Sequence, residues 1–106
     1  MAISLPPIEP KNPVLPADLL AVLAAIGEPA ALMHVLSDLL TPQEIEALRE
    51  RWQIAQLLTA GRSQRDIAAE LGVSVTTVSR GSRQLKYGPG GFEYAQSVLR
   101  LLSAEP

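Results

Sequence analysis

The stretch SQRDIAAELGVSVTTVSRGS, residues 63–82, has the pattern of two short helices joined by a tight turn. The first helix can begin after Ser63, a favourable N-cap residue, with Asp66 as the acidic member of a capping box. Its apolar side chains fall on one face at helical spacing, on Ile67, Ala68 and Leu71. Gly72 ends it, because glycine adopts a left-handed backbone conformation without steric cost. The stretch therefore predicts a helix-turn-helix at about residues 63–86.

The second helix of this stretch starts after another N-cap residue, Ser74, and is expected to end at Leu85 or Lys86. The side chains that can pack inward are Val75, Val78 and Leu85. Hydroxyl and guanidinium groups remain for the outer face, on Thr76, Thr77, Ser79, Arg80 and Arg83. A narrow apolar stripe with such an outer face is typical of a recognition helix in the DNA major groove. The alternative is an ordinary helical hairpin with a solvated face.

Four further segments have helical patterns, which makes the predicted fold all-α. They are residues 16–26, 27–40, 42–61 and 93–103. The third begins with a capping box formed by Thr41 and Glu44, and carries an apolar stripe that includes Trp52 as an expected core residue. The segment YGPGGF, residues 87–92, is expected to stop the recognition helix because of its glycines and proline.

The first two of these helices have almost no polar face. The chain of 106 residues is 47% hydrophobic but only 4% aromatic, which suits helices packed through Leu, Ile, Val and Ala. A helix that is apolar nearly all round needs cover on most sides, which one small domain cannot supply. We therefore predict an obligate homodimer, in which these helices pack against a second chain. The alternative is a monomer with an apolar surface.

The composition argues against several classes of protein. Residues 1–14 contain four prolines and are expected to form an extended arm, followed by one helical domain at residues 15–106. The chain has no cysteine, and its one histidine, His34, cannot build a zinc site unaided. It lacks the phosphate loop, His dyad or paired carboxylates that an enzyme would need, so we expect neither an enzyme nor a cofactor or metal. The absence of a membrane-spanning stretch or signal peptide points to the cytoplasm.

Charge is distributed unevenly although the net charge is −2. The predicted helix-turn-helix, residues 62–86, carries an excess of positive charge: Arg62, Arg65, Arg80, Arg83 and Lys86 against Asp66 and Glu70. Residues 1–40, by contrast, hold four acidic side chains against Lys11. A dimer would double the basic patch, and double-stranded DNA is the partner that such a patch favours.

Gly81 lies inside the predicted recognition helix, where glycine costs about 1 kcal/mol relative to alanine. Close approach of a ligand or of a neighbouring backbone would account for it. Simple tolerance of the glycine is the alternative.

The segment from Leu40 to Lys86 resembles the Trp repressor family through the motifs LTP-x-E-x-EAL, SQR and SRGS-x-x-LK. The resemblance implies a six-helix fold in an intertwined homodimer that acts as a sequence-specific DNA-binding transcriptional repressor. It also implies L-tryptophan as a corepressor, bound between the long helix and the recognition helix. The DNA-binding residues that it implies are Gln64, Arg65, Val75, Thr76, Thr77, Ser79 and Lys86.

The same resemblance implies a set of ligand-binding residues: Leu40, Thr41, Arg51, Arg80, Gly81 and Gln84. Leu40 and Thr41 would offer backbone carbonyls to the ligand's ammonium group from the other chain. Two guanidiniums can stack on an aromatic ring and one can grip a carboxylate, so an aromatic amino acid or organic acid suits Arg51 and Arg80. Alternatively, Arg51 pairs with a glutamate on its own helix and Arg80 contacts a phosphate.

Three features depart from the main pattern of the family. Gln84 replaces a serine near the ligand's ammonium group, the long helix is one residue shorter after Arg51, and residues 87–92 resemble a second branch of the family, the YerC group. Two alternatives therefore stay open: a ligand-independent DNA-binding regulator of the same fold, and a protein interaction module. For a repressor, we expect half-sites about 34 Å apart. We also expect bases to be read by Arg65 and the start of the recognition helix, and phosphates to be contacted by Gln64, Ser79 and Lys86.

Overall fold

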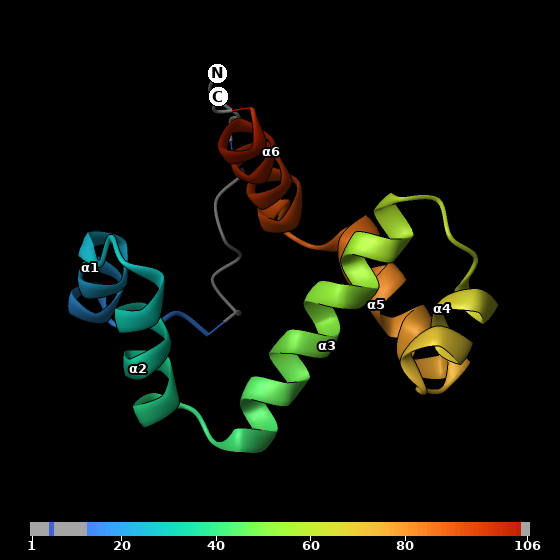
Figure 1. Ribbon diagram of the computed structural model, residues 1–106, viewed down its shortest axis with the longest axis horizontal. Helices are drawn as coiled ribbons and strands as arrows, with labels where there is room; N and C mark the ends of the chain where they lie inside the picture. The colour runs from blue at the N-terminus through green and yellow to red at the C-terminus, as the bar shows by residue number, and fades with distance from the viewer. Residues whose placement is uncertain (1–4, 6–12, 105–106) are drawn as a thin grey trace. The chain divides into compact units, whose positions relative to one another are not determined.

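The computed structural model describes residue 5 and residues 13–104, and within these residues it contains six α-helices and no strand (Figure 1). They are α1 (Ala17–Ala25), α2 (Pro29–Leu39), α3 (Pro42–Thr59), α4 (Gln64–Leu71), α5 (Val75–Tyr87) and α6 (Gly91–Ser103). The predicted all-α class and six-helix order are confirmed. Intertwining of two chains stays a prediction, and most of the arm expected at residues 1–14 lies outside the described residues.

Side-chain and glycine caps set the start of α3 and both ends of α4. The Thr41 hydroxyl accepts a hydrogen bond from the Glu44 N–H at 3.1 Å, and the Glu44 carboxylate accepts one from the Thr41 N–H at 2.8 Å. At α4 the Ser63 hydroxyl accepts from the Asp66 N–H at 3.1 Å. Gly72 takes the left-handed conformation, with φ of 70°, at the end of α4. The capping box predicted at Thr41 is thus complete; at α4 the Ser63 and Gly72 caps follow the prediction, whereas the described residues show no bond from the Ser63 N–H to the Asp66 carboxylate, which the predicted box would add.

The last two helices are longer than their patterns predict. α5 continues to Tyr87, and the Gly88 N–H donates to the Gln84 carbonyl at 2.8 Å. α6 begins at Gly91, because Gly90 takes a left-handed φ of 88° and turns the chain directly into the helix. The segment at residues 87–92 therefore separates the two helices with only three residues.

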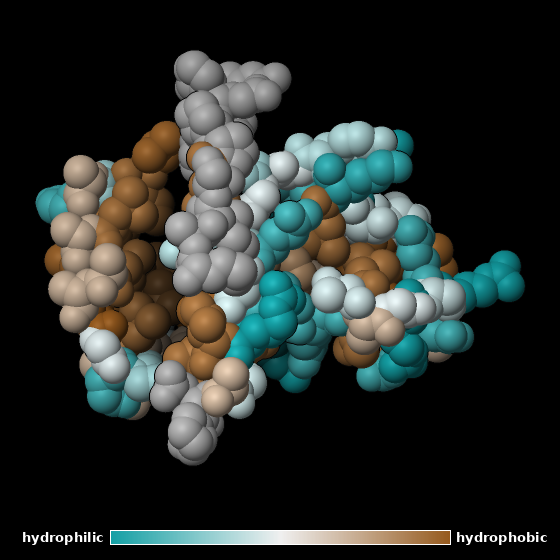
Figure 2. Space-filling view, turned by 90° about the horizontal axis from the view of Figure 1, so that it is seen from above, coloured by the Kyte–Doolittle hydropathy of each residue, from teal (hydrophilic) through white to brown (hydrophobic). Residues whose placement is uncertain are grey.

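The chain divides into two compact units, which meet within α3 at residues 50 and 51. The unit at residues 13–50 contains α1, α2 and the first half of α3. No side chain of α1 or α2 is buried, and large apolar residues such as Val22, Met33 and Leu39 are exposed. Figure 2 shows apolar side chains gathered at the surface of these helices. Within residues 13–50, the helices therefore leave these apolar side chains uncovered.

The unit at residues 51–104 contains the core, which is built from the end of α3 and from α4 and α5. Its buried side chains are Ile54, Ile67, Ala68 and Val78, with Leu57, Leu58, Leu71 and Val73 packed around them. The expectation that Trp52 is a core residue is wrong, since it is 41% exposed. Two residues of helix rotate a side chain by about 200°, so Trp52 and the buried Ile54 lie on opposite faces of α3. The Trp52 ring instead packs against the ring of Phe92 from α6 in an edge-to-face arrangement, with centroids 5.3 Å apart.

Candidate nucleic-acid interface

The helix-turn-helix is formed by α4 and α5, which pack through fully buried side chains. Ile67 of α4 and Val78 of α5 have no exposed surface, and Ala68 lets the helices approach closely. The Val73 N–H donates to the Ala68 carbonyl at 3.0 Å, which closes the turn after Gly72. The Ser74 hydroxyl then caps α5 by accepting from the Thr77 N–H at 3.1 Å. These contacts fix the direction in which α5 leaves the turn.

The outer face of α5 presents side chains suited to the major groove and to phosphates. Its exposed residues include Val75, Thr76, Arg80, Arg83 and Lys86. The expectation that Val75 packs inward is wrong, because it is 47% exposed at the free first turn of α5, whereas Val78 fills the core beneath the helix. An exposed valine at this position offers an apolar contact for a thymine methyl group.

Two hydroxyls of the expected DNA-binding set have partners inside the protein. The Thr77 hydroxyl lies 2.9 Å from the Ser74 hydroxyl, next to the α5 cap. The Ser79 hydroxyl donates to the Gln64 side-chain carbonyl across the helix pair, at 2.7 Å. Both threonine and serine are half-buried, whereas Thr76 is exposed. Among the polar residues at the start of α5, Thr76 is therefore the most accessible to a base edge.

Two more residues of the expected DNA-binding set, Gln64 and Arg65, lie at the N-terminal end of α4. Gln64 is the first residue of α4 and is half-buried, and Arg65 beside it is exposed. Arg62, just before the helix, forms an ion pair with Glu70 at 2.6 Å, and both charges are already included in the basic excess counted for residues 62–86. Both members of this pair are partly exposed, and we therefore assign it little weight in stability.

The end of α5 carries a residue that the sequence analysis did not single out. Tyr87 is 76% exposed, and the Lys86 ammonium lies 5.4 Å from the centroid of its ring. The sequence pattern placed Tyr87 in the segment that stops the recognition helix. Its position directly after Lys86, in a helix with basic side chains, was a signal that it could belong to the interface. The extra residues of α5 bring this aromatic side chain to the end of the candidate interface.

The expected ligand-binding residues are divided between the two units of the chain. Leu40 is the C-cap of α2 and Thr41 precedes α3, both in the unit at residues 13–50. The Thr41 carbonyl accepts the first bond of α3 from the Ile45 N–H, at 3.0 Å. Arg51, Arg80, Gly81 and Gln84 belong to the other unit. The structure therefore places four of the six residues within one compact unit.

Arg51 and Arg80 are exposed, and neither forms an ion pair within residues 13–104. The alternative that Arg51 pairs with a glutamate of its own helix is thus not seen in this part of the chain, where the ion pair of α3 joins Arg49 and Glu46 at 2.8 Å. The Arg51 and Arg80 guanidiniums are each chemically suited to a carboxylate, a phosphate or an aromatic ring.

Gly81 has a packing role within the protein. A Cβ atom built on Gly81 would lie 2.9 Å from Cγ2 of Ile54, closer than real Cβ contacts allow. Ile54 is a buried core residue of α3, and its branched side chain has little freedom to move. Close approach of α3 to α5 therefore accounts for the glycine without a ligand.

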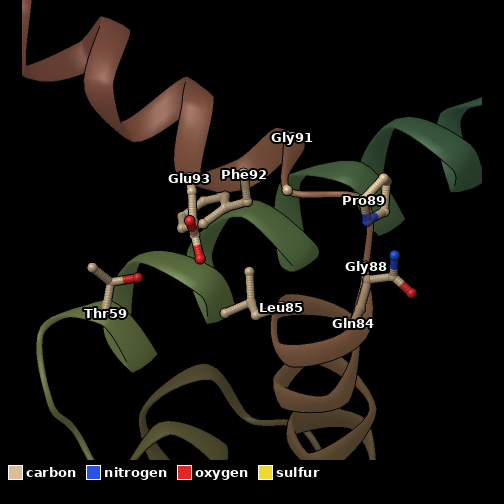
Figure 3. A pocket seen from close by; sticks show the side chains of 9 residues that line it. Thr59, Gln84, Leu85, Gly88, Pro89, Gly91, Phe92 and Glu93 are labelled. Atoms are coloured by element: carbon tan, nitrogen blue, oxygen red, sulfur yellow. The ribbon is translucent and has the colours of Figure 1, made fainter. Parts of the chain in front are cut away.

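A pocket of about 350 Å³ lies where α5 ends and α6 begins, beside the end of α3 (Figure 3). It is lined by Thr59, Gln84, Leu85, Phe92 and Glu93 together with residues 88–91. Gln84 is the one member of the expected ligand set that contributes to it. The pocket therefore differs in its lining from the site between two arginines that the resemblance implies.

Residues 13–104 bring together no group of three His, Asp or Glu side chains that could hold a metal ion. None of the described helices has the length and apolar character needed to cross a bilayer.

Comparison with known proteins gives a consistent result. The family model described as Trp repressor protein matches residues 17–100. The Trp operon repressor homolog of Aliivibrio salmonicida is 41% identical over 71 residues, which are 66% of each chain. The uncharacterized protein YerC of Bacillus subtilis is 40% identical over 58 residues, 55% of this chain and 56% of the relative. The Trp operon repressor homolog of Photobacterium profundum is 50% identical over 54 residues, 50% of this chain and 52% of the relative. The chain thus spans about half to two thirds of the length of these curated relatives.

Proposed function

The chain belongs to the Trp repressor family, whose members are transcription regulators and not enzymes, and on this premise we propose that it is a sequence-specific DNA-binding repressor. The observation that carries the proposal is the outer face of α5. That helix is anchored by the buried Val78 and capped by Ser74, while Val75 and Thr76 stand exposed at its first turn. A rigid helix with free side chains at its N-terminal end is what major-groove recognition requires.

The charges around this face support DNA as the partner. Arg65 on α4 and Arg80, Arg83 and Lys86 on α5 are all exposed. Contacts between such side chains and phosphates release counterions, so the affinity for DNA should fall steeply as salt is raised. We assign base reading to Arg65, Val75, Thr76 and Thr77, and phosphate contacts to Gln64 and Lys86, with Ser79 bonded to Gln64 beside them.

We further propose that the repressor is an intertwined homodimer. α1 and α2 have no buried side chain, although most of their residues are apolar. α6 likewise exposes Val98, Leu99 and Leu102. A second copy that covers these faces would present two recognition helices to half-sites about 34 Å apart on a palindromic operator.

The proposed effector is an aromatic amino acid, with L-tryptophan as the first candidate. The exposed guanidiniums of Arg51 and Arg80 fit a ring and a carboxylate, and two relatives carry the name Trp operon repressor homolog. Gly81 and Gln84 would complete this site within one chain, and the backbone of Leu40 and Thr41 would contribute from the partner. Binding of the ligand would hold α5 at the angle that DNA requires.

The second candidate is a DNA-binding regulator that needs no small molecule. The observation that favours it is the contact of Gly81 with Ile54, which explains the glycine by packing alone. Under this reading Arg80 contacts DNA phosphate.

Thermal unfolding with and without L-tryptophan separates the two candidates. A ligand at about 100 times its dissociation constant adds roughly 2.7 kcal/mol to the native state, which raises the melting temperature measurably. We expect a shift with L-tryptophan that disappears in Arg80→Ala and is retained in Arg49→Ala, since Arg49 is paired with Glu46. No shift with tryptophan or related indoles would favour the ligand-independent regulator.

A further inference from the structure

Ser79 and Gln64 form a side-chain hydrogen bond that joins the two helices of the helix-turn-helix. The Ser79 hydroxyl donates to the Gln64 side-chain carbonyl at 2.7 Å, between residues fifteen positions apart, and the bond is partly buried. We propose that Ser79 is a positioning residue, which acts on DNA through Gln64 by holding the Gln64 amide in place to donate to a phosphate. This inference rests on the proposed DNA-binding function.

The hydrogen-bonding capacity of the two groups supports this division of roles. A glutamine amide has a carbonyl acceptor and an NH₂ group with two donors, and Ser79 occupies the carbonyl. A serine hydroxyl has one proton, which this bond uses. A phosphate oxygen accepts hydrogen bonds and donates none. The group that remains to meet a phosphate is therefore the Gln64 NH₂, and the Ser79 hydroxyl is not free to do so while the bond is kept.

The positions of both residues in the fold also suit this role. Gln64 is the first residue of α4, and the N-terminal end of a helix favours a phosphate through its backbone N–H groups and dipole. Ser79 directly follows Val78, whose complete burial fixes the rotation of α5. The hydroxyl is thus presented from a rigid helix. A glutamine held in this way loses less side-chain freedom on binding DNA than a free one.

The test measures dissociation constants for a duplex selected by the protein from random sequences and for a scrambled duplex of the same length. We expect Ser79→Ala to weaken binding to both duplexes by the same factor, about fivefold for each hydrogen bond lost. Gln64→Ala should cause a similar loss, and the double variant should lose no more than Gln64→Ala alone. Non-additivity is the sign of residues that act as a unit.

A charge variant separates this role from a purely structural one. Gln64→Glu can still accept from Ser79, and its carboxylate is favourable at the N-terminus of α4, so thermal stability should be kept or raised. It lacks the NH₂ donors and repels phosphate, so its affinity for both duplexes should fall by more than that of Gln64→Ala. If Gln64 lay away from the phosphates, Gln64→Glu would bind DNA as the unchanged protein does.

Three results would overturn the inference while leaving the proposed function intact. The first is an unchanged affinity of Ser79→Ala for DNA. The second is additive losses in the double variant, which would mean that Ser79 contacts DNA itself. The third is a loss of affinity confined to the selected duplex, which would mean that the pair reads bases. If the unchanged protein binds no duplex at all, the proposed function falls as well, and the inference falls with it.

Discussion

Gly81 shows how one residue without a side chain can set the distance between two helices. Its place in the recognition helix was evident from the sequence, but the atom that approaches it was not, because Ile54 lies 27 positions earlier on α3. The resemblance to the family implied that a ligand lies beside Gly81, whereas in the structure the neighbour of Gly81 is the core residue Ile54. A residue that looks functional in the sequence can thus be explained by packing.

Gly81→Ala is therefore expected to destabilise the protein. Alanine gains about 1 kcal/mol of helix propensity over glycine. Overpacking a filled core costs typically 1–3 kcal/mol, and the new Cβ would meet Ile54 Cγ2 at 2.9 Å. We expect a net loss of about 1 kcal/mol in the free energy of unfolding by urea. Arg83→Ala, an exposed change on the same helix, is the control. A more stable Gly81→Ala would show that the close contact carries no cost.

Lys86→Ala tests a phosphate contact at the end of α5. The exposed lysine carries a charge but has no fixed geometry for a base, so its removal should weaken binding to all duplexes alike. The slope of the logarithm of the binding constant against the logarithm of salt concentration should also fall by about one unit for each Lys86. Glu93→Ala, outside the helix-turn-helix, serves as a control. An unchanged slope would place Lys86 away from the phosphates.

At the scale of single elements, the sequence predicted where helices begin and end better than it predicted which side chains of a helix are buried. The ends of α3 and α4 follow from Thr41, Ser63 and Gly72, because a cap depends on residues within four positions of one another. Burial depends on which helices meet, and for this reason the expectations for Trp52 and Val75 were wrong. The bond between Ser79 and Gln64 had no signal along the sequence, since only the packing of α4 on α5 brings them together.

The packing of α4 on α5 predicts a large effect for Ile67→Ala. Ile67 is fully buried between the helices, and truncation of such a side chain typically costs about 2–5 kcal/mol through lost burial and the cavity left behind. Urea unfolding followed by circular dichroism measures this loss. Val75→Ala, at a position 47% exposed on α5, should cost less than about 0.5 kcal/mol. Comparable losses in both variants would contradict the assignment of the core.

At the scale of the whole molecule, the apolar faces of α1 and α2 predict association of two chains. We expect sedimentation equilibrium to give a dimer, and the melting temperature to rise with protein concentration, as it does when folding and association are coupled. Met33→Glu places a charge on an exposed apolar side chain of α2 and should shift the equilibrium toward monomer. Glu46→Ala, on the exposed surface of α3, should leave the dimer intact. A monomeric protein at all concentrations would contradict the dimer proposal.

The central claim is that α4 and α5 of a dimer recognise a specific DNA sequence. The most direct measurement compares dissociation constants for a selected duplex and a scrambled one at several salt concentrations, with and without L-tryptophan. We predict that the selected duplex binds at least about 1,000-fold more tightly, and that both affinities fall as salt is raised. Equal and weak affinity for the two duplexes under every condition would contradict the claim and indicate an interaction module that uses the same fold.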